Sequence, residues 1–122
     1  NPSTPNRVTP EQLKATPIKA IMKSLPVNLN VEKAIETNKK IVFKFSDIDD
    51  VFSLHIRRGV AQLSTNIIEE PDLIINTDQQ TLKEIFAGLK NVASISLSLT
   101  DGTIEVEGGK MEFLKTLSLF KD

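Results

Sequence analysis

Apolar residues recur with two different periods along this 122-residue chain, and these periods predict where strands and helices lie. Ile41, Phe43 and Phe45 alternate with Val42 and Lys44, and a period of two is typical of a half-buried β-strand. Turn-forming residues separate this segment from others of the same kind. The pattern predicts five strands, over residues 41–45, 51–56, 60–65, 72–76 and 103–107.

The second period, of about 3.6 residues, predicts helices on both sides of these strands. The clearest series is Leu82, Ile85, Phe86 and Leu89, whose spacing places four apolar side chains on one helical face. Something must cover that face. The charged residues of the same segment are expected to point away from it: Lys83, Glu84 and Lys90.

Capping residues predict where the helices begin. Thr9 with Gln12, and Thr77 with Gln80, have the spacing at which two side chains satisfy each other's free backbone donors. Asn30 and Asn91 also precede periodic segments and are good N-caps. Pro26 is expected to end or bend the second helix. The predicted helices cover residues 9–16, 17–26, 30–38, 78–89, 91–99 and 110–120.

The order of these elements predicts an α+β fold in a single domain over residues 9–122, with residues 1–8 as a linker. Consecutive strands with short links are expected to pair as an antiparallel meander. The last strand has one polar face, which suits a strand at or near an edge. We therefore expect a five-stranded, mostly antiparallel sheet with helices packed over one face.

Composition excludes several function classes. The 15 basic and 16 acidic residues nearly balance, so no broad positive field favours nucleic acid. There is no cysteine, hence no disulfide or thiolate chemistry, and no apolar run is long enough to span a membrane. No signal peptide is visible, and the start at Asn1 rather than Met suggests a piece of a longer protein.

An acidic cluster at Asp47, Asp49 and Asp50 is the strongest apparent metal motif. It resembles the start of a calcium loop, but Val51 stands where the next oxygen ligand is required and the loop glycine is missing. A polar hairpin turn is the better interpretation. No metal ligand is therefore predicted.

The other reactive side chains do not form a catalytic arrangement either. Glu69 and Glu70 are adjacent on a predicted loop, so their carboxylates diverge. His55 alternates with Leu54 and Ile56, which places it on the helix-free face of the sheet. Gly109 followed by Lys110 lacks the remaining residues of a phosphate-binding loop. We predict no catalytic residue and no cofactor.

Several motifs stand in a recognisable order. They are PDLII at residues 71–75, the helix over 81–88, and DGTIEVEGG at 101–109, preceded by TPI at 16–18 and FKFSD at 43–47. Together these resemble the sterol carrier protein type 2-like (SCP2-like) domain, in the version found as the C-terminal domain of bacterial alkyl sulfatases. The resemblance covers about residues 9 to 120.

That resemblance implies a sheet and helices that enclose an apolar tunnel or cleft for alkyl chains, acyl chains or sterols. In alkyl sulfatases the domain is thought to receive the hydrophobic tail of the substrate, while a separate zinc-dependent domain of metallo-β-lactamase type performs hydrolysis. The metal signature of that hydrolase needs several histidines, and this chain has only His55. The resemblance thus implies a non-catalytic domain of a larger alkyl sulfatase, and leaves the bacterial periplasm and cytoplasm both open.

Three functions remain open at this point. One is an alkyl-chain, acyl-chain or sterol-like ligand-binding domain. Another is a structural or homodimerisation module whose pocket has collapsed, because an apolar stripe usually forms ordinary core. The third, an enzyme that acts alone, is the least favoured, because no arrangement of nucleophile, base and orienting group is visible. For the first, apolar residues of the sheet and of the last three helices are expected to line the site. They are Leu54, Ile56, Leu63, Ile75, Ile85, Phe86, Leu89, Ile95, Leu99, Phe113 and Leu117.

Overall fold

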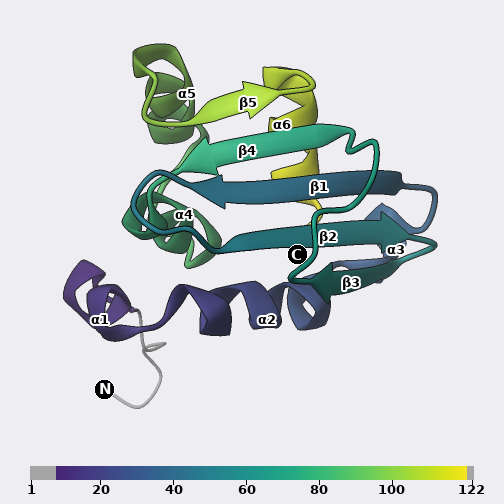
Figure 1. Ribbon diagram of the computed structural model, residues 1–122, viewed down its shortest axis with the longest axis horizontal. Coiled ribbons are helices and arrows are strands. Elements are labelled where there is room, and N and C mark those ends of the chain that lie inside the picture. Colours follow the sequence, from purple (N-terminus) through teal and green to yellow (C-terminus); the bar gives the residue numbers. More distant parts are fainter. Residues whose placement is uncertain (1–7, 121–122) are drawn as a thin grey trace.

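The computed structural model describes residues 8–120 and forms one mixed five-stranded sheet with six helices among those residues (Figure 1). The predicted linker, residues 1–8, lies outside the described part except for Val8. The strands are β1 (Asn38–Phe45), β2 (Val51–Arg57), β3 (Val60–Ser64), β4 (Leu73–Thr77) and β5 (Glu105–Glu107). The helices are α1 (Pro10–Ala15), α2 (Ile18–Asn28), α3 (Val31–Ala34), α4 (Gln79–Phe86), α5 (Val92–Asp101) and α6 (Lys110–Ser118).

The strand order is β3-β2-β1-β4-β5, so the predicted α+β class and the edge position of β5 are confirmed. The meander prediction is wrong for β4. This strand was expected to pair antiparallel with β3, but it pairs in parallel with β1. The other three pairings are antiparallel. The connection from β3 to β4 passes in front of β2 and β1 to reach the far side of β1 (Figure 1).

Hydrogen bonds to buried Ser53 on β2 hold this crossing connection. The Ser53 hydroxyl donates to the carbonyl oxygen of Asn66 at 2.6 Å and accepts from the N–H of Ile68 at 3.0 Å. At its end, the Asp72 N–H donates to the carbonyl oxygen of Lys40. These bonds place Leu73 beside Ile41, which gives β1 an apolar partner on both sides.

The two faces of the sheet are covered differently. The face that carries Phe43, Phe52, Leu54 and Ile75 packs against the helices and forms the core. Figure 1 shows α4 and α6 behind the sheet and α2 along its β3 side. The opposite face is crossed by the β3–β4 connection, and Val42 is fully buried there. The predicted one-sided helical cover is therefore confirmed.

Capping follows the sequence closely except at α4. Thr9 and Gln12 form the predicted capping box of α1, while Asn30 and Asn91 cap α3 and α5. At α4 the prediction is wrong, because the cap is Asp78, whose carboxylate accepts from the Thr81 N–H. Thr77 belongs to β4, where its buried hydroxyl donates to the carbonyl oxygen of Thr103.

Lys83 also differs from its predicted orientation. It was expected to point away from the apolar face of α4, yet it is only 5% exposed and its Nζ donates to the carbonyl oxygen of Leu13 at 3.0 Å. The reason is tertiary, since α1 packs on α4 at this point and presents the Leu13 carbonyl oxygen, which accepts from the Thr16 N–H and has a second lone pair for the lysine. The lysine thus joins two helices that are distant in sequence.

Candidate functional site

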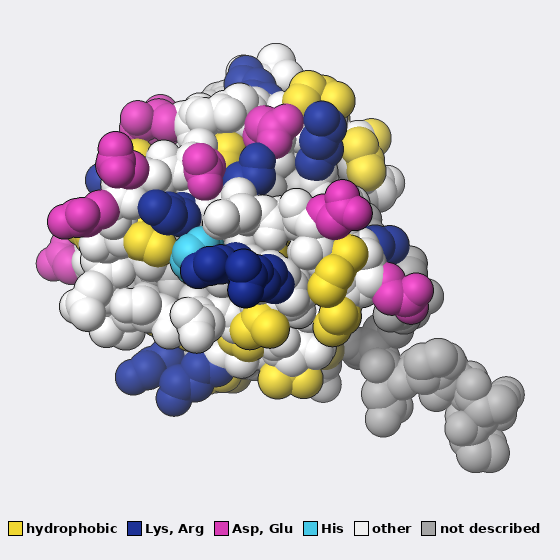
Figure 2. Space-filling view, turned by 90° about the vertical axis from the view of Figure 1, so that its right-hand side faces the viewer, with side chains coloured by type: hydrophobic (Ala, Val, Ile, Leu, Met, Phe, Trp, Pro, Cys, Tyr) yellow, Lys and Arg dark blue, Asp and Glu magenta, His cyan; other side chains and the backbone are white. Residues whose placement is uncertain are grey.

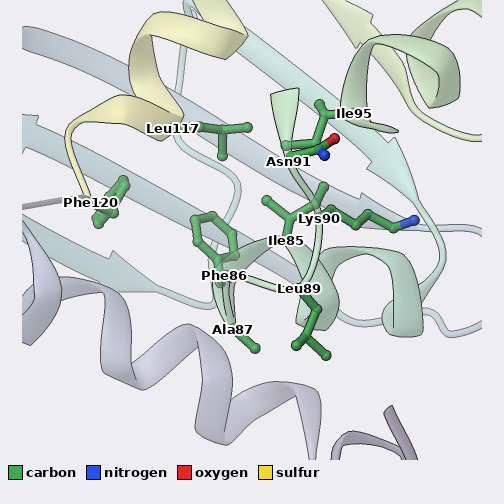
Figure 3. A pocket seen from close by; sticks show the side chains of 10 residues that line it. Ile85, Phe86, Ala87, Leu89, Lys90, Asn91, Ile95, Leu117 and Phe120 are labelled. Carbon is green, nitrogen blue, oxygen red and sulfur yellow. The ribbon is translucent and has the colours of Figure 1, made fainter. Parts of the chain in front are cut away.

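A pocket of about 490 Å³ lies between the end of α4, the beginning of α5 and the end of α6 (Figure 3). This volume falls within the range typical of small-molecule sites, about 300–1,000 Å³. Seven of its ten lining residues carry apolar side chains. The lining residues are Ile85, Phe86, Ala87, Gly88, Leu89, Lys90, Asn91, Ile95, Leu117 and Phe120.

The short connection between α4 and α5 forms one side of the pocket. Helix α4 ends at Phe86, and the Leu89 N–H then donates to the carbonyl oxygen of Glu84 at 2.9 Å, which folds the connection back on the helix. Asn91 begins α5, because its side-chain oxygen accepts from the Ser94 N–H at 2.8 Å. Backbone and capping bonds therefore fix both ends of this wall.

Aromatic contacts fix the apolar end of the pocket. The rings of Phe86 and Phe120 meet edge to face with centroids 5.7 Å apart, and Phe86 meets Phe43 of the sheet in the same manner at 6.3 Å. Edge-to-face packing is a favoured arrangement of aromatic pairs. In Figure 3, Phe86 and Leu117 point toward the space between α4 and α6.

The opposite edge of the pocket is polar. The Lys90 ammonium lies 3.7 Å from a carboxylate oxygen of Glu84, and its side chain is 24% exposed. The other Glu84 oxygen accepts from the side-chain amide of Gln80 at 3.0 Å. The pocket thus combines an apolar interior with a cation at its edge.

The structure brings part of the predicted lining set together. Five of its members line this pocket, namely Ile85, Phe86, Leu89, Ile95 and Leu117. Four others are at most 1% exposed and belong to the core between sheet and helices: Leu54, Ile56, Ile75 and Phe113. Leu99 is also buried, and Leu63 is half-buried on β3.

Sequence reasoning did not select the remaining lining residues. Phe120 follows Phe113 at a helical spacing of seven residues, so the periodicity of the last helix carried a signal for it. Lys90 and Asn91 carried no such signal. Their place at the pocket depends on how the α4–α5 connection folds.

The other reactive side chains singled out from the sequence lie elsewhere. His55 is half-buried on the helix-free face, as predicted, with its Nε2 2.9 Å from the Asn38 side-chain oxygen. Asp47 contacts the start of α4, where its carboxylate accepts from the Gln79 N–H at 3.3 Å. Within residues 8–120, no cluster of three or more histidine, aspartate or glutamate side chains is suited to hold a metal ion.

Two carboxyl groups outside the pocket have perturbed acidity. Hydrogen bonds from the Thr103 side chain and backbone hold the pKa of Asp101 below its usual value. The hydrogen bond from Lys39 and its charge, together with Lys115, lower the pKa of Glu112. Both shifts follow from donors that stabilise the ionised form. Neither carboxyl lines the pocket.

Comparison with known proteins identifies the family. The model of the family described as "Alkyl sulfatase C-terminal" matches residues 6–122, nearly the whole chain. The chain belongs to this family. The alkyl sulfatase C-terminal domain is also similar, at 26% identity over 113 residues, to a linear primary-alkylsulfatase of Pseudomonas sp. (strain ATCC 19151). The match covers 93% of this chain and 21% of that enzyme.

Solved structures confirm the SCP2-like fold of this domain. A stereoselective inverting sec-alkylsulfatase from Pseudomonas sp. matches with a TM-score of 0.78 and 17% identity, over 98% of this chain and 19% of that one. The sterol carrier protein domain 2 of Helicoverpa armigera matches with a TM-score of 0.68 and 19% identity, over 95% of this chain and 92% of that one. The chain therefore spans about a fifth of the length of the alkylsulfatases it matches. No helix within residues 8–120 is long and apolar enough to cross a membrane.

Proposed function

We propose that this domain binds the alkyl tail of the substrate in an alkyl sulfatase and takes no part in the bond-breaking chemistry. The observation that carries the proposal is the apolar pocket of about 490 Å³ between α4, α5 and α6. Its family membership adds the substrate class, because alkyl sulfate esters carry a long apolar tail. Hydrolysis is assigned to a zinc-dependent domain of metallo-β-lactamase type elsewhere in the parent chain.

The energetics of tail binding are consistent with a useful affinity. Each buried CH₂ group contributes about 0.8 kcal/mol, so a decyl chain supplies roughly 8 kcal/mol before the costs of association. After those costs, affinity near the micromolar range is expected for longer chains. Because Phe, Leu and Ile side chains form most of the wall, selectivity should follow the length and bulk of the tail.

A binding titration tests this proposal. The purified domain is titrated with a fluorescent fatty acid, and decyl sulfate is added as a competitor below its micellar range. Saturable binding with displacement is expected. Binding that does not saturate, or that decyl sulfate fails to displace, would contradict the proposal. Hydrolysis of decyl sulfate by the domain alone would contradict its non-catalytic part.

A pair of matched variants assigns the binding to the pocket. Leu89 lines the pocket and is half-buried, whereas Leu97 is 69% exposed on α5 and does not line it. Leu89→Gln places an amide in the apolar wall and should weaken binding about tenfold, because a buried polar group without a partner is costly. Leu97→Gln should bind as the unaltered domain does.

The alternative, a structural or dimerisation module, is favoured by a different surface. Val31, Ile35 and Val60 are 57%, 53% and 58% exposed, and Val31 and Ile35 pack on the turn at Gly59 that precedes Val60. Figure 2 shows hydrophobic side chains beside basic ones on the end of the molecule where α3 and this turn lie. Light scattering after size-exclusion chromatography distinguishes the two. A dimer that Val60→Asp dissociates, without saturable ligand binding, would favour the alternative.

A further inference from the structure

The pocket is polarised from one end to the other. Figure 3 places Phe86, Leu117 and Phe120 toward one side, while the Lys90 side chain extends away from them and carries its nitrogen to the opposite edge. Its aliphatic stem runs beside Ile85. A long charged side chain commonly covers apolar surface with its stem and keeps its charged end near water. A ligand with an apolar tail and a charged head fits this direction.

The Lys90 ammonium retains hydrogen-bonding capacity. At 3.7 Å its contact with Glu84 is longer than a hydrogen bond, and Glu84 is engaged by Gln80 through its other oxygen. Asp101 is influenced by the charge of Lys90 but lies beyond ion-pair distance, and Thr103 holds its carboxylate. An ammonium has three donors, so Lys90 can still donate hydrogen bonds to an anionic ligand.

Two further groups at the same edge favour an anion. Asn91 uses its side-chain oxygen to cap α5, and its side-chain NH₂ has no hydrogen-bond partner among residues 8–120. The N-terminal end of the ten-residue helix α5 adds a partial positive charge next to it. These groups add to the charge of Lys90, which is the only full positive charge among the described residues that line the pocket.

We propose that Lys90 makes the pocket selective for amphiphiles with an anionic head, and so lets it distinguish an alkyl sulfate from the corresponding alcohol. This inference rests on the proposed function. Hydrolysis of the ester by water gives the alcohol and hydrogen sulfate, so the product keeps the tail and loses the charged head. A domain that binds only the tail would bind substrate and product with equal affinity. Lys90 lowers the relative affinity for the alcohol and so favours its release.

Competition binding with three ligands of equal tail length tests the inference. A neutral fluorescent alkyl alcohol serves as the probe, and decyl sulfate, 1-decanol and decyltrimethylammonium are the competitors. In the unaltered domain, decyl sulfate should bind about three- to tenfold more tightly than 1-decanol, the range expected for one partly exposed charge pair. Decyltrimethylammonium should bind most weakly, and added salt should reduce the differences.

Variants then assign the selectivity to Lys90. Lys90→Met should remove the advantage of decyl sulfate and leave 1-decanol unchanged, while Lys90→Arg should keep it. Glu84→Gln should increase the advantage, because it removes the carboxylate that competes for the ammonium. Lys44→Met, at an exposed position on β1, is the matched control and should behave as the unaltered domain.

The outcomes separate this inference from the proposed function. If Lys90→Met binds both ligands as the unaltered domain does, the inference is overturned and tail binding stands. If Glu84→Gln loses the selectivity as Lys90→Met does, the pair has only a structural role and the inference is again overturned. If no competitor displaces the probe from the unaltered domain, the proposed function itself fails. Thermal melting of each variant checks that it is folded.

Discussion

The Nζ of Lys83 on α4 donates a hydrogen bond to the carbonyl oxygen of Leu13 in α1 over 3.0 Å, and both residues are buried. This contact joins the first helix to the wall that continues into the pocket between α4, α5 and α6, because α4 also supplies Ile85 and Phe86. The side-chain amide of Gln80 supports it by donating to the carbonyl oxygen of Pro10 at 3.2 Å. The docking of α1 therefore depends on two side chains of α4.

Lys83→Ala should lower the free energy of unfolding by about 1–3 kcal/mol, since it removes a buried charge-assisted hydrogen bond and the packing of the stem. Lys83→Met keeps most of the stem and should cost less. Chemical denaturation measures both values. Lys83→Ala should also increase the rate of amide hydrogen exchange more in α1 than in the sheet, relative to the unaltered domain. Equal stability of Lys83→Ala and the unaltered domain would contradict this role.

The crossing connection between β3 and β4 should depend on Ser53. Its hydroxyl is buried, at 1% exposure, and bonds to the backbone of both Asn66 and Ile68. Ser53→Ala removes both of these part-buried hydrogen bonds and should cost about 1–3 kcal/mol. Ser64→Ala is the control, because Ser64 is exposed and its hydroxyl bonds, within residues 8–120, only to the Asn66 N–H. Urea unfolding measures the loss of stability in each variant. A smaller loss for Ser53→Ala than for Ser64→Ala would contradict the role of Ser53 in holding the connection.

Gly108 and Gly102 should respond differently to the same substitution. Both have positive φ, +106° and +87°, so alanine is strained at each position. A Cβ at Gly108 would lie 2.0 Å from the carbonyl oxygen of Asp72, whereas one at Gly102 meets nothing within 4 Å. Gly102→Ala should cost about 1–2 kcal/mol, and Gly108→Ala about 3 kcal/mol or more. Similar thermal unfolding of the two variants would show that β5 can move away from β4.

The pair between Lys39 and Glu112, which joins β1 to α6 over 2.6 Å, should make stability depend on pH. The hydrogen bond and the charge of Lys39, with a contribution from Lys115, lower the folded-state pKa of Glu112. A lowered pKa stabilises the fold above the unfolded-state pKa, and this stabilisation is lost as pH falls through the folded-state pKa.

Glu112→Gln should therefore melt at a lower temperature than the unaltered domain near neutral pH, and the difference should vanish once the pH falls below the lowered folded-state pKa of Glu112. Glu36→Gln is the control, because Glu36 is exposed and forms no ion pair within residues 8–120. Differential scanning calorimetry across the acidic range checks this result. A difference that persists unchanged in acid would show that the Glu112 charge is not its cause.

Local patterns were sufficient for most of the elements. The alternation from Ile41 to Phe45 and the caps at Thr9, Asn30 and Asn91 depend on neighbours only a few residues away, so the sequence predicted them correctly. At α4 the prediction of Thr77 as the cap was wrong, because the register of β4 places Thr77 in the sheet. Thr77 pairs with Phe45 in the sheet, which leaves Asp78 to begin the helix.

By itself, then, the sequence determined the α+β class, most of the helix starts, the helix-free face that carries His55, and the family resemblance that the comparisons confirm. Periodicity also identified apolar residues that must be buried, but it does not distinguish a residue that faces its neighbours from one that faces an open pocket. Leu54 and Leu117 fit the same pattern, yet only Leu117 lines the pocket.

Tertiary structure decided the rest, because these features require segments distant in the chain to meet. The parallel pairing of β4 with β1 needed the connection anchored at Ser53, and the burial of Lys83 needed the end of α1. The position of Lys90 opposite Phe120 needed α6 to fold back beside α4. The sequence therefore specified the apolar faces, and their packing determined which part of them remains open beside a charge.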